Sequence, residues 1–306
     1  MQAALLSDRG VVEVAGQNAR KFLNGLLTSD VGKLRPAHAA FAALLTPQGK
    51  IIVDFIVAAA SEGEAFALDC PRALAPALKQ RLDFYKLRAQ VTVEDRSQAL
   101  GVLAIWDGPP WPPPHPPPQA EEGREGALYF QDPRLPELGL RCILAPELAG
   151  DAAAEIAAQL VDASAYETHR IALGVPRGGL DFIYGDAFPH ETDMDQLGGV
   201  DFNKGCFVGQ EVVSRIEHRG TARARVVPLA FDGFAPEPGT PVTAGERTIG
   251  TLGSSAHGRA LAMLRLDRTA DALAAGAALS AGGVAMRLAK PQWARFPFPG
   301  EAKAAE

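Results

Sequence analysis

The N-terminal third of the chain alternates between short apolar runs and amphipathic stretches, a pattern typical of a mixed α and β domain. VVEVAG predicts a strand, and FAALLTPQGKIIVDFIVAAA predicts two strands that form a hairpin around a Pro-Gln-Gly turn. NARKFLNGLLTSDVGKL predicts a helix with Phe22, Leu23, Leu26 and Leu27 on one face. ALAPALKQRLDFYKL predicts another helix, and RAQVTVED alternates as a half-buried strand does.

The middle of the chain repeats this alternation around a proline-rich run. GVLAIW, ALYF and LRCILA predict strands, and DAAAEIAAQLVDASAYETHRIALG predicts one long helix that ends at Gly174. The run PPWPPPHPPP, from Pro109 to Pro118, cannot donate backbone hydrogen bonds and favours an extended polyproline II form. We interpret it as a surface insertion, with an SH3-type ligand as the alternative.

From about Thr221 the pattern changes to short apolar runs separated by glycine- and proline-rich turns. VVPLAF, RALAMLRL and VAMRLA predict the strands of a small C-terminal β domain over residues 221–296. The preceding residues 1–220 are expected to form a body with two subdomains, about 1–95 and 96–220, and the insertion 109–118 belongs to the second of them.

Composition and charge narrow the class of protein. A chain of 306 residues with 47% hydrophobic and 22% charged residues is expected to form more than one soluble domain. A net charge of −6 does not favour direct nucleic-acid binding. The N-terminus does not resemble a signal peptide, and no apolar run is long enough to predict a membrane span.

The three cysteines, Cys70, Cys142 and Cys206, are far apart and odd in number. This pattern argues against a disulfide framework or a self-contained zinc site and predicts a reducing cytoplasm. Six histidines without paired spacing give no further reason to expect a metal. Nucleotide-binding and hydrolase signatures such as GxGxxG and GxSxG are absent from the sequence.

The stretch NKGCFVGQEVV, from Asn203 to Val213, is the strongest candidate for chemistry. If VGQEVVSRI is a helix, Cys206 lies at or just before its first turn. Unpaired backbone N–H groups and the positive end of the helix dipole would favour a thiolate there, and Lys204 would add to the effect. A buried structural cysteine is the alternative that the residues alone leave open.

Basic residues gather close to this stretch. Four arginines lie within one short window and are joined by Lys204 and His218: Arg215, Arg219, Arg223 and Arg225. Such a run forms either a solvated face or a site for an anionic tail, because guanidinium groups pair well with carboxylates.

These residues resemble a known family. YETHRIALGVPRGGLDF, FPHE and VDFNKGCFVGQEVVSR are similar to the signature region of YgfZ-like folate-binding proteins. These proteins are relatives of the glycine-cleavage aminomethyltransferase GcvT and include mitochondrial iron–sulfur assembly factors. KFLNGLLTSDV, LLTPQGKIIVDFIV and RLDFYKLRAQVTVED resemble the same family in the same order, so the resemblance covers nearly the whole chain apart from the proline-rich run.

The resemblance implies an α+β fold in which three domains form a ring around a folate pocket, with a small C-terminal β-barrel. It implies tetrahydrofolate or another reduced folate as cofactor, and iron–sulfur assembly proteins and client enzymes as partners. It gives Cys206 a redox or transfer role. The folate-binding positions that it implies are Lys204, Gly205, Gln210, Glu211, Arg170, Glu191 and Arg215.

Two departures from GcvT bear on activity. GcvT has two adjacent acids, one of them catalytic, where this chain has Val53 and Asp54, and it has a pterin-binding glutamate where this chain has Ala172. We therefore expect a folate-dependent accessory factor for assembly or repair of iron–sulfur enzymes. The alternatives are an aminomethyl or one-carbon transferase, with Asp54 as its catalytic residue, and a factor acting in tRNA modification.

Overall fold

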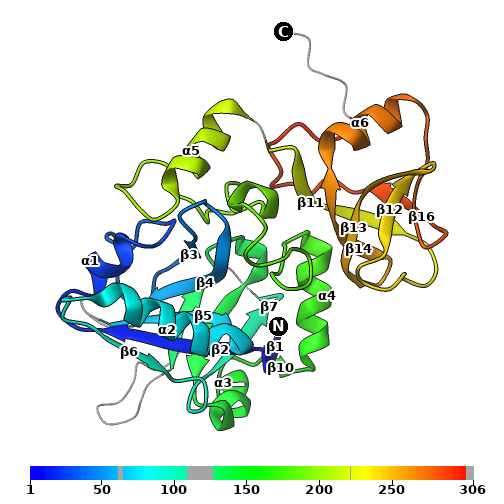
Figure 1. Cartoon of the computed structure of the whole chain (residues 1–306). Coiled ribbons are helices and arrows are strands. Elements are labelled where there is room, and N and C mark those ends of the chain that lie inside the picture. Colours follow the sequence, from blue (N-terminus) through cyan, green and yellow to red (C-terminus); the bar gives the residue numbers. More distant parts are fainter. Residues whose placement is uncertain (61–64, 109–126, 221, 301–306) are drawn as a thin grey trace. The chain divides into compact units, whose positions relative to one another are not determined.

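The computed structural model describes residues 1–60, 65–108, 127–220 and 222–300 (Figure 1). The proline-rich insertion predicted at 109–118 lies outside these ranges. The chain divides into two compact units. The first unit comprises Met1–Pro47, Ile52–Tyr166 and Leu197–Gln210, and the second comprises Gln48–Ile51, Glu167–Gln196 and Glu211–Glu306. The domain limits expected from the sequence stay a prediction.

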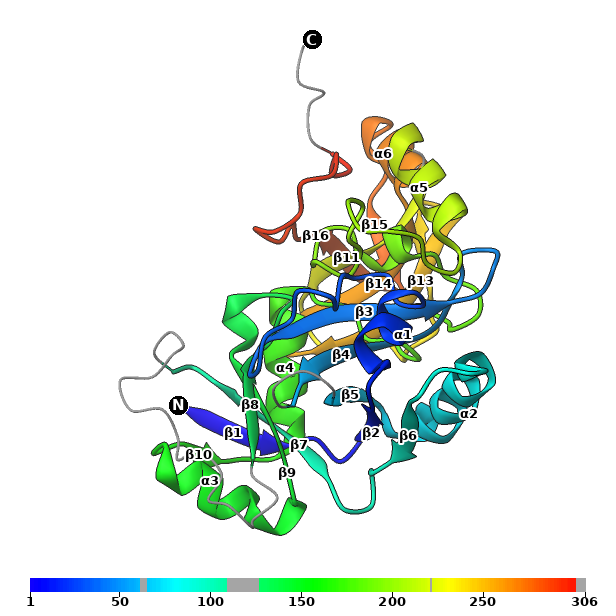
Figure 2. The same cartoon turned by 90° about the vertical axis from the view of Figure 1, so that its left-hand side faces the viewer.

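One five-stranded sheet of the first unit has the order β3-β4-β5-β2-β6. The predicted hairpin is confirmed, because β3 and β4 are neighbours joined by the Pro-Gln-Gly turn. Helices α1 and α2 lie on one side of this sheet (Figure 2). Their buried apolar residues share one core cluster with those of the strands. The elements are β2 (Arg9–Ala15), α1 (Ala19–Asn24), β3 (Ala39–Leu45), β4 (Ile51–Ala59), β5 (Ala65–Pro71), α2 (Ala75–Lys86) and β6 (Thr92–Asp95).

The helix predicted from Asn18 onward is shorter than its apolar pattern suggested. It ends at Asn24, because the following residues pair with β3. The Thr28 N–H donates to the Ala43 carbonyl (3.2 Å), and the Ala43 N–H donates to the Thr28 hydroxyl (2.8 Å). Leu23 and Leu27 are nevertheless buried in the expected core. The apolar spacing therefore predicted the core residues correctly but the length of the helix wrongly.

A second five-stranded sheet of the first unit has the order β10-β1-β7-β9-β8. The strands predicted from GVLAIW, ALYF and LRCILA are confirmed as β7, β8 and β9, whereas β1 and β10 were not predicted. Helix α3 (Ala149–Glu155) packs against it. The strands are β1 (Gln2–Leu5), β7 (Gly101–Trp106), β8 (Leu128–Gln131), β9 (Leu140–Leu144) and β10 (Gln159–Leu160).

The single long helix predicted from Asp151 to Gly174 is wrong. The chain leaves the helical conformation at Ala157, whose φ is 53°, and forms β10, which pairs with β1. The N–H of Val161 donates to the carbonyl of Ala3 (2.8 Å). A new helix, α4 (Ala163–Leu173), then ends before Gly174, where a φ of 77° suits glycine.

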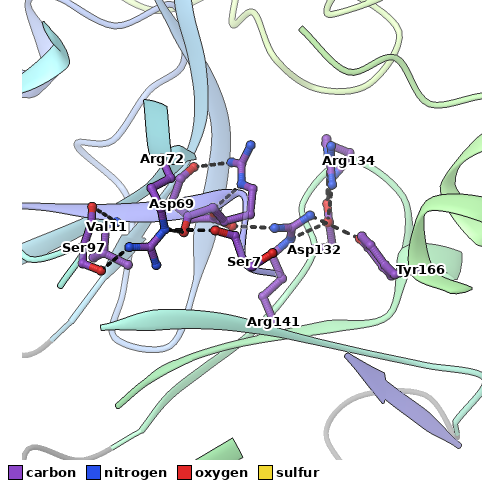
Figure 3. A network of polar contacts seen from close by, with 10 residues as sticks. Ser7, Val11, Asp69, Arg72, Ser97, Asp132, Arg134, Arg141 and Tyr166 are labelled. Atoms are coloured by element: carbon purple, nitrogen blue, oxygen red, sulfur yellow. Dashed lines mark hydrogen bonds and ion pairs between the residues drawn. The ribbon is translucent and has the colours of Figure 1, made fainter. Parts of the chain in front are cut away.

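A buried network of charged side chains joins the two sheets of the first unit (Figure 3). Asp69 on β5 accepts hydrogen bonds from Arg9 Nε (2.6 Å) and Arg141 Nη1 (2.5 Å). Arg141 on β9 also donates to Asp132 (2.9 Å) and to the Tyr166 hydroxyl (3.2 Å). Burial alone would raise the pKa of Asp132, but Arg134 and Arg141 hold it well below its usual value.

The C-terminal strands form a closed barrel with the order β11-β14-β13-β12-β15-β16. The β domain predicted from the short apolar runs is confirmed, and the chain has the expected α+β class with a small C-terminal barrel. The elements are β11 (Ala224–Phe231), β12 (Pro241–Ala244), β13 (Arg247–Ala256), β14 (Arg259–Arg265), α6 (Leu266–Ala274), β15 (Leu279–Ala281) and β16 (Val284–Leu288). Among the helices of the described ranges, none has the length and apolar character needed to cross a membrane.

Candidate functional site

Lys204 fixes the glycine-cysteine segment to the first unit. Its Nζ donates hydrogen bonds to three backbone carbonyls, those of Asn24 (2.8 Å), Leu27 (2.5 Å) and Ser29 (3.0 Å). An ammonium group has three N–H donors, so these carbonyls use all of them. Lys204 is therefore a structural anchor between the segment and the chain that runs from the last residue of α1 into the following loop.

Burial lowers the pKa of Lys204 from its usual 10.5 to about 8, and the carboxylates of Asp30 and Asp201 oppose the shift only in part. The Lys204 ammonium also lies 5.3 Å from the centre of the Phe207 ring. The sequence suggested that this lysine would stabilise a thiolate at Cys206. In the structure its hydrogen bonds go to backbone oxygens instead.

Cys206 is exposed, in contrast to the other two cysteines. Burial raises the pKa of Cys70 and of Cys142 to about 12, so both thiols stay protonated at neutral pH. A side chain at Gly205 would meet no atom within 4 Å, so the backbone beside Cys206 borders open space. The structure thus removes the alternative of a buried structural cysteine at position 206.

The helix after Cys206 begins later than predicted. Helix α5 spans Gln210–Arg219, because Gly209 has a φ of 82° and cannot belong to a right-handed helix. Cys206 therefore lies four residues before the first helical residue, outside the first turn. The Gln210 side chain accepts a hydrogen bond from the Phe207 N–H (3.3 Å), within the turn that precedes the helix.

Asp54 lies on the opposite face of β4 from the apolar core. Val53 and Phe55 belong to the core cluster, whereas Asp54 shares its face with Ile56, which is paired with Asp69. Burial alone would lower the pKa of Arg9, but Asp69 and Asp54 raise it above its usual value. Asp54 is thus close enough to the buried charge network to contribute to its electrostatics.

Arg170 and Glu191, both in the second unit, make local contacts. Arg170 is buried and bonds to Glu167, to Asp181 (3.0 Å) and to the Ser254 hydroxyl (2.8 Å), so it ties α4 to the barrel strand β13. Glu191 lies in the short helix η4 (Pro189–Thr192) and accepts a hydrogen bond from the Phe188 N–H (2.8 Å). Folate binding by either residue stays a prediction.

The expected cluster of arginines is only partly a surface feature. Arg215 pairs with Glu211 on the exposed face of α5 (2.7 Å), and Arg219 and Arg223 are exposed. Arg225 is instead buried and bonded to Asp193 and Asp195. A site for an anionic tail that includes Arg225 is therefore wrong, because its guanidinium is already paired with two carboxylates inside the second unit.

Comparison with family models matches two parts of the chain. Residues 6–110 match the model described as the GCVT N-terminal domain. Residues 223–296 match the model described as the CAF17 C-terminal beta-barrel domain, and these residues include the whole closed barrel.

Curated relatives decide the family. The human mitochondrial iron–sulfur cluster assembly factor IBA57 is 31% identical over 94% of this chain and 84% of its own length. The mouse protein of the same name is 33% identical over 86% of this chain and 77% of its own length. The chain belongs to the IBA57 family.

Fungal members of the IBA57 family are longer than the region they share with this chain. The Mycosarcoma maydis homologue is 36% identical over 74% of this chain, but the chain spans only 57% of that protein. It spans 54% of the Neurospora crassa homologue, which is 31% identical. These relatives are named as mitochondrial proteins, which corrects the cytoplasmic location expected from the sequence. Unpaired cysteines indicate a reducing compartment and do not distinguish the cytoplasm from another one.

The fold agrees with the family model at the N-terminus. The glycine cleavage system aminomethyltransferase T from Bartonella henselae has a TM-score of 0.75 with this chain. It covers 97% of this chain and 87% of its own at 18% identity. The expected GcvT-like fold is confirmed.

Proposed function

We propose that this protein is an accessory factor for the assembly or repair of iron–sulfur cluster enzymes and that Cys206 is its working thiol. The observation that supports the proposal best is an exposed cysteine two residues after a lysine that is anchored by three hydrogen bonds. Lys204 holds the backbone two residues before the thiol, so that Cys206 is presented at a fixed place. Membership of the IBA57 family supports the iron–sulfur role.

A reduced folate is the cofactor in this proposal. Its support is the match to the GCVT N-terminal domain and the GcvT-like fold. Open space beside Gly205 leaves room for a ligand near the thiol. Lys204 would support folate binding only by holding the segment in place, because its three N–H donors are already used. Glu211 and Arg215 on α5 are exposed, so their polar groups are accessible from solvent.

The aminomethyl or one-carbon transferase is the weaker candidate. General acid or base catalysis requires a positioned group that reaches the substrate. Of the two adjacent acids found in GcvT, this chain keeps only Asp54, because Val53 takes the other position and packs in the core. Asp54 lies near the charge network of Arg9 and Asp69, which is an environment typical of a structural residue. The tRNA-modification alternative rests on exposed arginines alone, and Arg225 no longer belongs to them.

Deletion of the gene in the source organism tests the proposal. The activities of a panel of iron–sulfur enzymes are measured beside the glycine-cleavage activity. The accessory role predicts a fall in several iron–sulfur enzymes with glycine cleavage unchanged, restored by a plasmid copy. A loss confined to glycine cleavage would instead establish the transferase. Unchanged activities in both groups would reject both functions.

A further inference from the structure

A histidine and two carboxylates meet in the second unit, away from Cys206 along the chain. His190 lies in η4, Asp195 follows it, and Glu217 lies near the C-terminal end of α5. His190 Nε2 is 3.0 Å from Glu217 Oε2. One nitrogen or oxygen atom from each of the three side chains lies within 4.8 Å of the others. We propose that His190, Asp195 and Glu217 bind one divalent first-row transition-metal ion, such as Zn²⁺.

The donor types fit such an ion. An imidazole nitrogen with two carboxylate oxygens suits zinc, manganese or ferrous iron better than magnesium or calcium, which prefer oxygen ligands alone. Bonds of about 2.1 Å in a tetrahedral site place ligand atoms about 3.4 Å apart. The separations in the structure are at most 4.8 Å, so the ligand atoms need to approach one another by no more than about 1.4 Å. The Glu217 side chain is 43% exposed on a helix surface and can supply that movement.

Arg225 supplies the outer contacts that such a site needs. It donates to both oxygens of Asp195 (2.8 Å each) and to the His190 carbonyl (2.7 Å). Carboxylates that bind metals usually accept hydrogen bonds of this kind, which hold them in place. Arg225 also donates to Asp193 Oδ1 (3.0 Å), so it links this neighbouring carboxyl to the same group.

One further observation points to an occupant. A cavity of about 350 Å³ is lined by His190, Glu217 and Arg225, and its other walls include Leu266 and Phe296, so that an ion could enter and keep a water ligand.

Titration of chelator-treated full-length protein with Zn²⁺ by calorimetry tests the site. All variants carry Cys206→Ser, because an exposed thiol could bind zinc by itself. Glu217→Gln keeps the size of the side chain and removes the charge at a partly exposed position, so folding should survive. His190→Gln removes the nitrogen ligand. His218→Gln is the matched control, since His218 is the exposed neighbour of Glu217 on the same helix.

The expected result is one Zn²⁺ per chain, with affinity lowered by about a hundredfold in Glu217→Gln and His190→Gln and unchanged in His218→Gln. Co²⁺ should give a visible absorption band that Glu217→Gln loses. Absence of saturable Zn²⁺ binding would overturn the proposal. Equal binding by the parent and Glu217→Gln proteins would overturn it as well.

Discussion

Lys204 combines a buried ammonium group with three carbonyl acceptors, and its protonation should affect stability. Its pKa is about 8 in the folded protein and near 10.5 in the unfolded chain. Between these values the unfolded chain binds more protons, so the contribution of Lys204 to the free energy of unfolding should rise with pH, by up to about 1.4 kcal/mol per unit. Below pH 8 the cost of burying the charge is present in full.

Urea unfolding of the parent protein and of Lys204→Met from pH 7 to pH 10 measures this effect. The difference in free energy of unfolding, parent minus variant, should move in favour of the parent as pH rises above 8. Other titrating groups are shared by the two proteins and cancel. A difference that is flat or falls over this range would show that the carbonyls keep the ammonium charged.

The three cysteines should differ sharply in reactivity. Cys206 is exposed, whereas Cys70 and Cys142 are buried with pKa values raised to about 12. Alkylation near neutral pH should therefore modify Cys206 first and leave the other two nearly unmodified while the protein is folded. Site-resolved mass spectrometry measures the three rates, and unfolding in urea, which should equalise them, is the control. Equal rates in the folded protein would contradict the described burial.

Among the polar contacts described in the first unit, we expect the loss of the charge network between its two sheets to lower the free energy of unfolding most. Asp69→Asn leaves Arg9 and Arg141 without their shared carboxylate and should lower the free energy of unfolding by about 3–5 kcal/mol. Glu211→Gln breaks an exposed pair with Arg215 and should cost less than about 0.5 kcal/mol. Urea unfolding followed by circular dichroism compares them. A cost below about 1 kcal/mol for Asp69→Asn would show that the network is not needed for stability.

The elements that could be predicted are those whose apolar spacing agrees with their tertiary contacts. The β3–β4 hairpin, α2 and the barrel strands are of this kind. The alanine-rich stretch after Asp151 failed because its local helical preference is overridden at Ala157 by pairing of β10 with β1. The local sequence of β10 does not indicate that it will pair with a parallel strand, β1, about 160 residues earlier in the chain.

The polar sites could not be predicted from the sequence, for a related reason. Arg9, Asp69, Asp132 and Arg141 are separated by up to 132 residues and carry no shared spacing, so only the fold brings them together. His190 and Glu217 are likewise 27 residues apart. The family motif did identify Cys206 and Lys204 as a unit, but not that the lysine bonds to the loop after α1.

For the chain as a whole, folate binding is the most general test of the cofactor proposal. Calorimetry with tetrahydrofolate should show one site in the micromolar range, about −8 kcal/mol. Polyglutamate forms should bind more tightly, in a salt-sensitive way, if the exposed Arg215, Arg219 and Arg223 receive the tail. Glu211→Gln, which removes the ion-pair partner of Arg215, should not reduce the extra affinity of the polyglutamate forms. Absence of binding at millimolar ligand would remove folate from the account.

The most direct test of the central proposal is complementation of the deletion strain with Cys206→Ser. Serine nearly keeps the size of cysteine at an exposed position, so the free energy of unfolding should change by less than about 0.5 kcal/mol. The parent gene should restore the iron–sulfur enzymes, whereas the serine variant, expressed at the same level, should fail to restore them. Full restoration by Cys206→Ser would contradict the proposal that this thiol is the working group.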